Sequence, residues 1–278
     1  MKIGIYANLE RDIDGGAART LATLLIKRGH EVLLSRNLAC LNLHSPLLDK
    51  SELASASDAI VVLGGDGTVL RIAKECAAHR TLIIAINFGH MGFLSEIEKM
   101  DELDVVFEQI EKGDFYTEKR GILEVSFQGK SYKALNEVVL ARGRSTKLIR
   151  FSVIVNGNTL NNYSADGIIV STPTGSTAYS LSAGGPVVAP ELNAMIITPI
   201  CPHSLNSRSY IIADDSKITI ELKKSDGETN LNIDGDDVIT LQAGDTINVK
   251  RSGLDALFIR LKKYNYYRKL LAKMNTLN

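Results

Sequence analysis

Short apolar runs alternate with helix-spaced apolar positions through the first 113 residues of the chain. Apolar runs typical of buried strands lie at 2–7, 31–35, 59–63 and 81–87. Helical spacing of apolar residues predicts helices over 15–28, 68–79 and 101–112. Residues 36–57 are expected to form a loop with some helical character. This order predicts an α/β N-terminal domain with a Rossmann-like parallel sheet and right-handed crossovers.

The pattern changes to strands and turns from Gly121 onward. Runs at 122–127, 132–140 and 151–155 are typical of strands, and Gln128-Gly129-Lys130 and Asn156-Gly157 are turn signals between them. We therefore expect an α/β domain at 1–118 and a β-rich C-terminal domain at 119–255. The tail at 256–278 alternates apolar and basic residues and is expected to pack back on the first domain.

Composition and charge narrow the class of protein. Lys and Arg total 32 and so do Asp and Glu, so no net field attracts nucleic acid or an anionic membrane. Cys40, Cys76 and Cys201 are too scattered for a disulfide framework or a zinc site, which favours a reducing compartment. No apolar run reaches the ~18 residues of a membrane span. We expect a cytoplasmic protein without nucleic-acid or membrane partners.

The apolar run at 59–63 ends on Gly64-Gly65-Asp66-Gly67-Thr68 and continues as a helix. Glycines allow close approach of a ligand to the backbone, and a helix N-terminus favours an anion such as phosphate. A carboxylate among phosphate-binding amides is poorly suited to bind phosphate, so Asp66 is expected to accept a proton or hold a metal. The alternative is a simple glycine turn with Asp66 as a helix cap.

Two more residues of this half are candidates. Arg71 lies in the first turn of the predicted helix, where it would reach a phosphate or an adenine, or remain solvated. His90 lies in a second glycine loop, where it would be catalytic or merely exposed. A dehydrogenase of the usual kind carries G-x-G-x-x-G after its first strand, whereas this chain has Asn8-Leu9-Glu10 there, which weighs against hydride transfer.

The second half carries two polar motifs. Asn136 and Glu137 would lie on opposite faces of the predicted strand, so that one of them faces a ligand. The stretch from Asp166 to Pro186 reads as a strand followed by a small, hydroxyl-rich loop. Small residues let a flat ring approach the backbone, and Tyr179 offers a face for stacking. The alternative is a Gly/Ser-rich linker, which the flanking apolar strands disfavour.

Taken together, these motifs resemble the NAD kinase family over residues 58–237. Gly-Gly-Asp-Gly also occurs in phosphofructokinases and in lipid kinases, but the Thr-Pro-Thr-Gly-Ser-Thr-Ala-Tyr-Ser-Leu-Ser-Ala-Gly-Gly-Pro run at 172–186 is far more specific. The resemblance implies phosphoryl transfer to the 2′-hydroxyl of the adenosine ribose of NAD, giving NADP. The donor would be ATP or inorganic polyphosphate, and the acceptor NAD or NADH.

The resemblance also implies roles for individual residues. Asp66 would be the general base, Gly67 would lie against the same site, and Gly64, Gly65 and Thr68 would complete the phosphate-donor loop. Residues implied to bind NAD in the β-rich domain are Asn136, Glu137, Lys147, Ser164, Asp166, Thr177, Ala178, Tyr179, Ser180, Leu181, Ser182 and Asp236, with Arg71 assisting from the first domain. Ser164 and Asp236 depart from the family pattern, in which many members have arginine and glutamine there, respectively.

No G-x-x-x-x-G-K-[ST] phosphate loop occurs, so glycine amides and a divalent metal ion, Mg or Mn, are expected to hold the donor phosphates. A homodimer or homotetramer is implied by the resemblance alone. Two other functions stay open: a lipid or sugar kinase that shares Gly-Gly-Asp-Gly, and a non-catalytic sensor that binds dinucleotide without turnover.

Overall fold

The computed structural model describes residues 1–87, 92–95, 97, 100–204, 207–262 and 264–276. The chain divides into two compact units, Met1–Lys119 with Ala256–Asn278 and Arg120–Asp255. It passes between them within two long strands, β6 (Tyr116–Phe127) and β17 (Thr246–Arg260). The tail therefore belongs to the first unit. No helix of the described residues is long and apolar enough to cross a bilayer.

The first unit is built on a parallel sheet, as the sequence predicts. Its strands are β1 (Lys2–Ala7), β2 (Glu31–Ser35), β3 (Leu47–Leu48), β4 (Ala59–Leu63) and β5 (Leu82–Ile86). They lie in the order β3-β2-β1-β4-β5, and the end of β17 adds to β5 in parallel. The helices are α1 (Gly16–Lys27), α2 (Lys50–Ala56), α3 (Asp66–His79), α4 (Leu103–Glu111) and α6 (Tyr266–Thr276). Short 3₁₀ turns occur at Ile13–Gly15, Arg36–Leu41 and Met100–Glu102.

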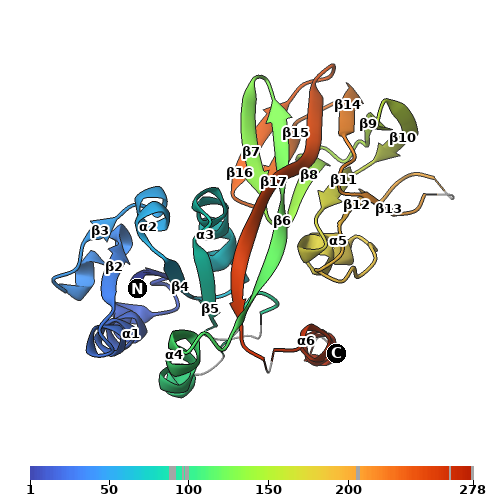
Figure 1. Cartoon of the computed structure of the whole chain (residues 1–278). Coiled ribbons are helices and arrows are strands. Elements are labelled where there is room, and N and C mark those ends of the chain that lie inside the picture. The colour runs from blue at the N-terminus through green and yellow to red at the C-terminus, as the bar shows by residue number, and fades with distance from the viewer. Residues whose placement is uncertain (88–91, 96, 98–99, 205–206, 263, 277–278) are drawn as a thin grey trace. The chain divides into compact units, whose positions relative to one another are not determined.

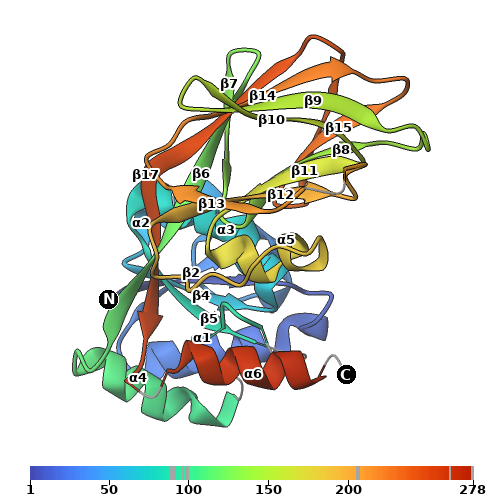
Figure 2. The same ribbon diagram turned by 90° about the vertical axis from the view of Figure 1, so that its right-hand side faces the viewer.

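Helices cover both faces of this sheet, with α2 and α3 on one side and α1 and α4 on the other (Figures 1 and 2). Strands β1, β2, β4 and β5 are correspondingly buried over most of their length, and β4 has no exposed residue. Burial on both faces explains why these strands read as continuous apolar runs. Parallel strands also place their carboxyl ends at one edge, where the turn after β4 carries Gly64 to Gly67.

The second unit packs two antiparallel sheets on one apolar core. One contains β10 (Asn158–Ala165), β9 (Ile149–Val155), β14 (Ile218–Lys224) and β17, with β6 and β7 (Lys130–Ala134) beside them. The other has the order β13 (Tyr210–Ala213), β12 (Ala194–Ile200), β11 (Gly167–Ser171), β8 (Glu137–Arg142), β15 (Thr229–Ile233), β16 (Asp237–Leu241). Figure 2 shows the layers, and Phe151 of one sheet and Ile168 of the other share the core.

Three local predictions need correction. The strand expected over 132–140 is two strands, β7 and β8, because the chain bends at Leu135 and Asn136. Asn136 and Glu137 are therefore not on opposite faces of one strand. Helix α3 begins at Asp66, two residues before its predicted start. The segment 36–57 contains a full helix, α2, whose N-terminus is closed by a capping box between Asp49 and Glu52.

Candidate functional site

Two glycines make the turn between β4 and α3. A Cβ at Gly64, where φ is +155°, would lie 2.3 Å from Thr68 Oγ1, and a Cβ at Gly65 would lie 2.8 Å from Arg11 Nη1. Gly65 is also the N-cap of α3, so the helix starts without a side-chain cap. Asp66 is the first residue of the helix rather than its cap, which corrects the alternative interpretation of this acid. Its carboxylate is available for another role.

The Asp66 carboxylate is held by a neighbouring backbone segment. Oδ2 accepts a hydrogen bond from the amide of Phe93 (2.9 Å), and Oδ1 accepts one from the amide of Leu94 (3.1 Å). A Cβ at Gly92 would lie only 2.2 Å from Oδ1, so glycine is required for this approach. The side chain is nevertheless 28% exposed. Asp66 is thus fixed in position and still accessible.

The C-terminal segment of the first unit secures this arrangement. Arg260 Nη1 donates to the carbonyl oxygen of Leu94 (3.0 Å), and Lys269 Nζ donates to the carbonyl oxygen of Ser95. Lys273 Nζ lies 3.9 Å from Asp66 Oδ2. Arg260 and Lys269 therefore contact the segment that holds Asp66, and Lys273 lies beside the carboxylate itself.

The other candidates of this unit lie on or beside α3. Gly67 is exposed, and a Cβ placed there would meet no described atom within 4 Å apart from the backbone of its own helix. Thr68, in contrast, is buried under the turn. Arg71 is exposed on the helix. His90 lies outside the described residues.

A buried carboxylate shapes the bend that carries Asn136 and Glu137. Asp234 accepts hydrogen bonds from three successive amides, those of Leu135 (2.7 Å), Asn136 (2.8 Å) and Glu137 (3.1 Å). These bonds replace the strand pairing that the apolar pattern predicts at this point. They bring Asp234 and Glu137 close together, and the side chain of Asn136 is half-buried.

Glu137 is an unusual acid in this bend. It is 9% exposed, and its Oε2 has no hydrogen-bond partner among the described residues. Burial, with the nearby charge of Asp234 as a second cause, raises the pKa of Glu137 to about 7. An unsatisfied buried carboxyl oxygen is costly in a static core and is more common where a ligand binds.

The hydroxyl-rich run forms an ordered turn rather than a linker. After β11 it makes a 3₁₀ turn, Thr174–Thr177, and a one-turn helix, α5 (Tyr179–Ser182). Thr172 ties it to the bend by donating its Oγ1 proton to the carbonyl oxygen of Leu135 (2.6 Å). A Cβ at Gly175 would lie 2.2 Å from the carbonyl oxygen of Asn136. The run and the Asn136 bend are thus in direct contact.

The predicted residues of the run differ in exposure. Tyr179 is 44% exposed and Ser182 is exposed, while Thr177, Ala178 and Leu181 are half-buried. Ser180 is fully buried, and its hydroxyl bonds that of Thr198 (3.0 Å). The exposed tyrosine is the one with a ring face available to a ligand.

The remaining predicted residues of the β-rich unit are more widely placed. Asp166 forms an ion pair with Arg142. Lys147 is exposed, 3.9 Å from Asp226, and Asp236 is exposed in the turn after β15.

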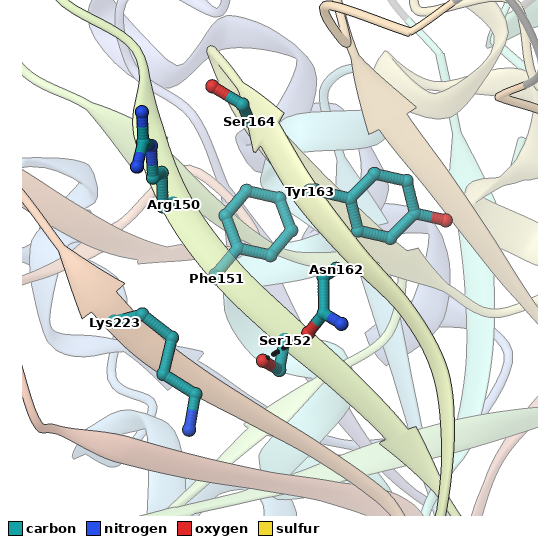
Figure 3. A pocket seen from close by; sticks show the side chains of 7 residues that line it. All are labelled: Arg150, Phe151, Ser152, Asn162, Tyr163, Ser164 and Lys223. Carbon is teal, nitrogen blue, oxygen red and sulfur yellow. Dashed lines mark hydrogen bonds between the residues drawn. The ribbon is translucent and has the colours of Figure 1, made fainter.

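Ser164 lines an open cavity of about 390 Å³ with Arg150 and Lys223 (Figure 3). Arg150 of β9 is paired with Ser164 of β10, so a positively charged side chain lies next to this serine.

Comparison with known proteins decides the family. Models described as the ATP-NAD kinase N-terminal and C-terminal domains match residues 48–115 and 135–261. A protein of Thermoanaerobacter sp. (strain X514) named NAD kinase is 38% identical over 98% of both chains, and one of Natranaerobius thermophilus is 34% identical over 98% and 97%. The chain belongs to the NAD kinase family.

Solved structures of the NAD kinase family share its fold. Yeast NADH kinase, complexed with NADH, has a TM-score of 0.87 and 27% identity, covering 99% of this chain and 87% of that one. An NAD kinase from Archaeoglobus fulgidus, in complex with ATP, has a TM-score of 0.80 and 28% identity, covering all of both chains.

Sequence reasoning missed three residues that the NAD kinase fold brings to these sites. Asp234 can be found only from its hydrogen bonds to a bend that lies about a hundred residues earlier in the sequence. Arg142 can be found only from its ion pair with Asp166. Lys273 belongs to no sequence motif. Lys269 and Lys273 are four residues apart, however, a spacing that places two side chains on one face of a helix.

Proposed function

We propose that the protein transfers the terminal phosphoryl group of ATP to the 2′-hydroxyl of the adenosine ribose of NAD, giving NADP and ADP. Membership of the NAD kinase family and the ATP and NADH complexes of its structural neighbours support this activity. The observation that carries the mechanism is the Asp66 carboxylate, held by the amides of Phe93 and Leu94 but still accessible.

Asp66 acts as the general base in this proposal. Its carboxylate takes the proton of the 2′-hydroxyl as the hydroxyl oxygen forms a bond to the γ-phosphorus. The bond between that phosphorus and the bridging oxygen of ADP breaks, and ADP leaves with the electron pair. In phosphoryl transfer the protein mainly positions the reacting groups and neutralises charge. The hydrogen bonds from two backbone amides to Asp66 provide such positioning.

We assign the divalent ion to the donor complex. Within the described ranges, no three His, Cys, Asp or Glu side chains are grouped as metal ligands. Mg²⁺ commonly binds through substrate phosphates and waters with few protein ligands, so MgATP needs no such cluster, and Mn²⁺ would serve in the same way. When bound, the ion neutralises charge on the donor phosphates. Gly64, Gly65, Gly67 and Thr68 form the turn that we assign to those phosphates.

We assign dinucleotide binding to the bend and run of the β-rich unit. This assignment is supported by the buried Glu137 oxygen, which has no hydrogen-bond partner in the described part of the chain, by the half-buried Asn136 and by the exposed ring of Tyr179. The assignment keeps the other predicted NAD contacts, namely Arg71, Lys147, Ser164, Asp166, Thr177, Ala178, Ser180, Leu181, Ser182 and Asp236. A homodimer or homotetramer, a cytoplasmic location and use of polyphosphate remain parts of the proposal that family resemblance alone supports.

The test is a coupled assay with NAD, Mg²⁺ and either ATP or polyphosphate, in which an NADP-specific dehydrogenase detects the product. Wild type should form NADP, and Asp66→Asn should lower kcat on the order of 10²-fold to 10⁴-fold while largely sparing NAD affinity. Asp101→Asn, which neutralises an exposed acid of the same unit, is the matched control.

Undiminished turnover in Asp66→Asn would show that Asp66 is not the general base. NAD binding without NADP formation, with either donor and with Mn²⁺, would favour the sensor. Activity on a lipid or sugar hydroxyl instead would favour the other kinases that share Gly-Gly-Asp-Gly.

A further inference from the structure

Helix α6 aims two lysines at the segment that holds Asp66. Lys269 Nζ donates to the carbonyl oxygen of Ser95 and lies 5.6 Å from the centre of the Tyr264 ring. Lys273, one helical turn later, lies on the same face of the helix. Its Nζ is 4.2 Å from the centre of the Phe93 ring and 3.9 Å from Asp66 Oδ2.

The Lys273 ammonium lies near both the Phe93 ring and the Asp66 carboxylate. Its side chain is 30% exposed, so it is neither buried nor freely solvated. Phe93 offers the face of its ring below the ammonium, while its own amide donates to the same carboxylate oxygen. The 3.9 Å between Lys273 Nζ and Asp66 Oδ2 is longer than a normal hydrogen bond, so the two groups interact through the attraction of their charges. A small anion beside Asp66 would therefore meet a positive charge already in place.

We propose that Lys273 is a phosphate-binding residue of the reaction, whose ammonium contacts the phosphoryl group as it passes from ATP to the hydroxyl beside Asp66. This inference rests on the proposed function, because it assigns a partner to the same carboxylate. A lysine ammonium is a compact point charge that suits a phosphoryl oxygen. It offsets the negative charge that the donor brings next to Asp66, and such charge stabilisation is a large part of phosphoryl-transfer catalysis.

The simpler reading is that Lys273 only docks α6. The docking of the helix, however, has other contacts: Tyr266 is buried at its start, and Lys269 bonds Ser95. Removal of the Lys273 charge should therefore leave the helix in place. This difference makes the two readings separable by experiment.

The experiment compares Lys273→Met and Lys273→Arg with Arg268→Met, which removes an exposed cation from the same helix. Lys273→Met should lower kcat/KM for ATP on the order of 10-fold to 10²-fold. ATP binding, measured by calorimetry, should weaken while NAD binding and the thermal midpoint stay near wild type. Lys273→Arg should recover most of the ATP affinity, and Arg268→Met should match wild type.

Equal activity and ATP affinity in Lys273→Met and Arg268→Met would overturn the proposal. A folded Lys273→Arg that loses ATP affinity would overturn it too, even if Lys273→Met does not fold. If wild type makes no NADP, the proposed function fails by itself. Calorimetry with ATP still tests whether Lys273 binds phosphate in that case.

Discussion

Arg260 and Glu118 form an ion pair inside the first unit, with 2.6 Å between Nε and Oε2. The guanidinium side chain is completely buried, and Glu118 is 16% exposed. The guanidinium carbon lies 5.1 Å from the centre of the Phe258 ring and 4.1 Å from the centre of the Tyr264 ring. Arg260 also bonds the carbonyl of Leu94, whose amide bonds Asp66. One buried cation thus connects the interior of the unit to the proposed base.

Replacement of Glu118 by glutamine should therefore destabilise the protein strongly. The change removes the charge of one partner of a completely buried guanidinium, and breaking a buried ion pair in this way typically costs about 3 to 5 kcal/mol. Urea unfolding followed by circular dichroism measures the loss. Lys2→Met, which breaks the exposed Lys2–Glu31 pair, should leave the midpoint almost unchanged. Equal effects of the two variants would contradict the structural role of the Arg260 pair.

Glu137 should make stability depend on pH. Its folded pKa of about 7 lies above the ordinary value of 4.5. Between these values the unfolded chain releases the proton more readily, so stability falls as pH rises from 4.5 to about 7. The difference corresponds to about 3 kcal/mol at most. Glu137→Gln stays neutral and should escape this loss.

Urea unfolding at several pH values from 4.5 to 8 checks this expectation. The stability of wild type should fall relative to that of Glu137→Gln across the range, and the exposed Glu191→Gln should follow wild type. Parallel curves for wild type and Glu137→Gln would show that Glu137 ionises as readily in the folded protein as in the unfolded chain.

Gly92→Ala should damage activity more than stability. Its Cβ would lie 2.2 Å from Asp66 Oδ1, so either the carboxylate or the segment must move. A displacement of about 1 Å in a catalytic group can cost on the order of 10²-fold in rate. Steady-state kinetics should show a fall in kcat of that order. Gly16→Ala should behave as wild type, because its new Cβ would meet no atom of the described residues within 4 Å apart from the backbone of its own helix. An unchanged kcat in Gly92→Ala would show that glycine is not required at position 92.

The strands of the first unit were predictable because each is a short apolar run buried on both faces, such as β4. The hairpin at Asn156-Gly157 was predictable because its turn signal is local. The bend at Asn136 was not, since its cause is a carboxylate 98 residues away. Lys273 reaches Asp66 only through tertiary packing of α6, and helix propensity carries no information about such contacts.

The loop that holds Asp66 depends on residues that the ribosome adds much later. The strand and the Gly-Gly-Asp-Gly turn at 59–67 emerge early, but Arg260, Lys269 and Lys273 follow only after the entire β-rich unit. A growing chain can therefore assemble its parallel strands while Asp66 still lacks part of its support. Removal of α6, which carries Lys269 and Lys273, would leave Asp66 with the same loss of support.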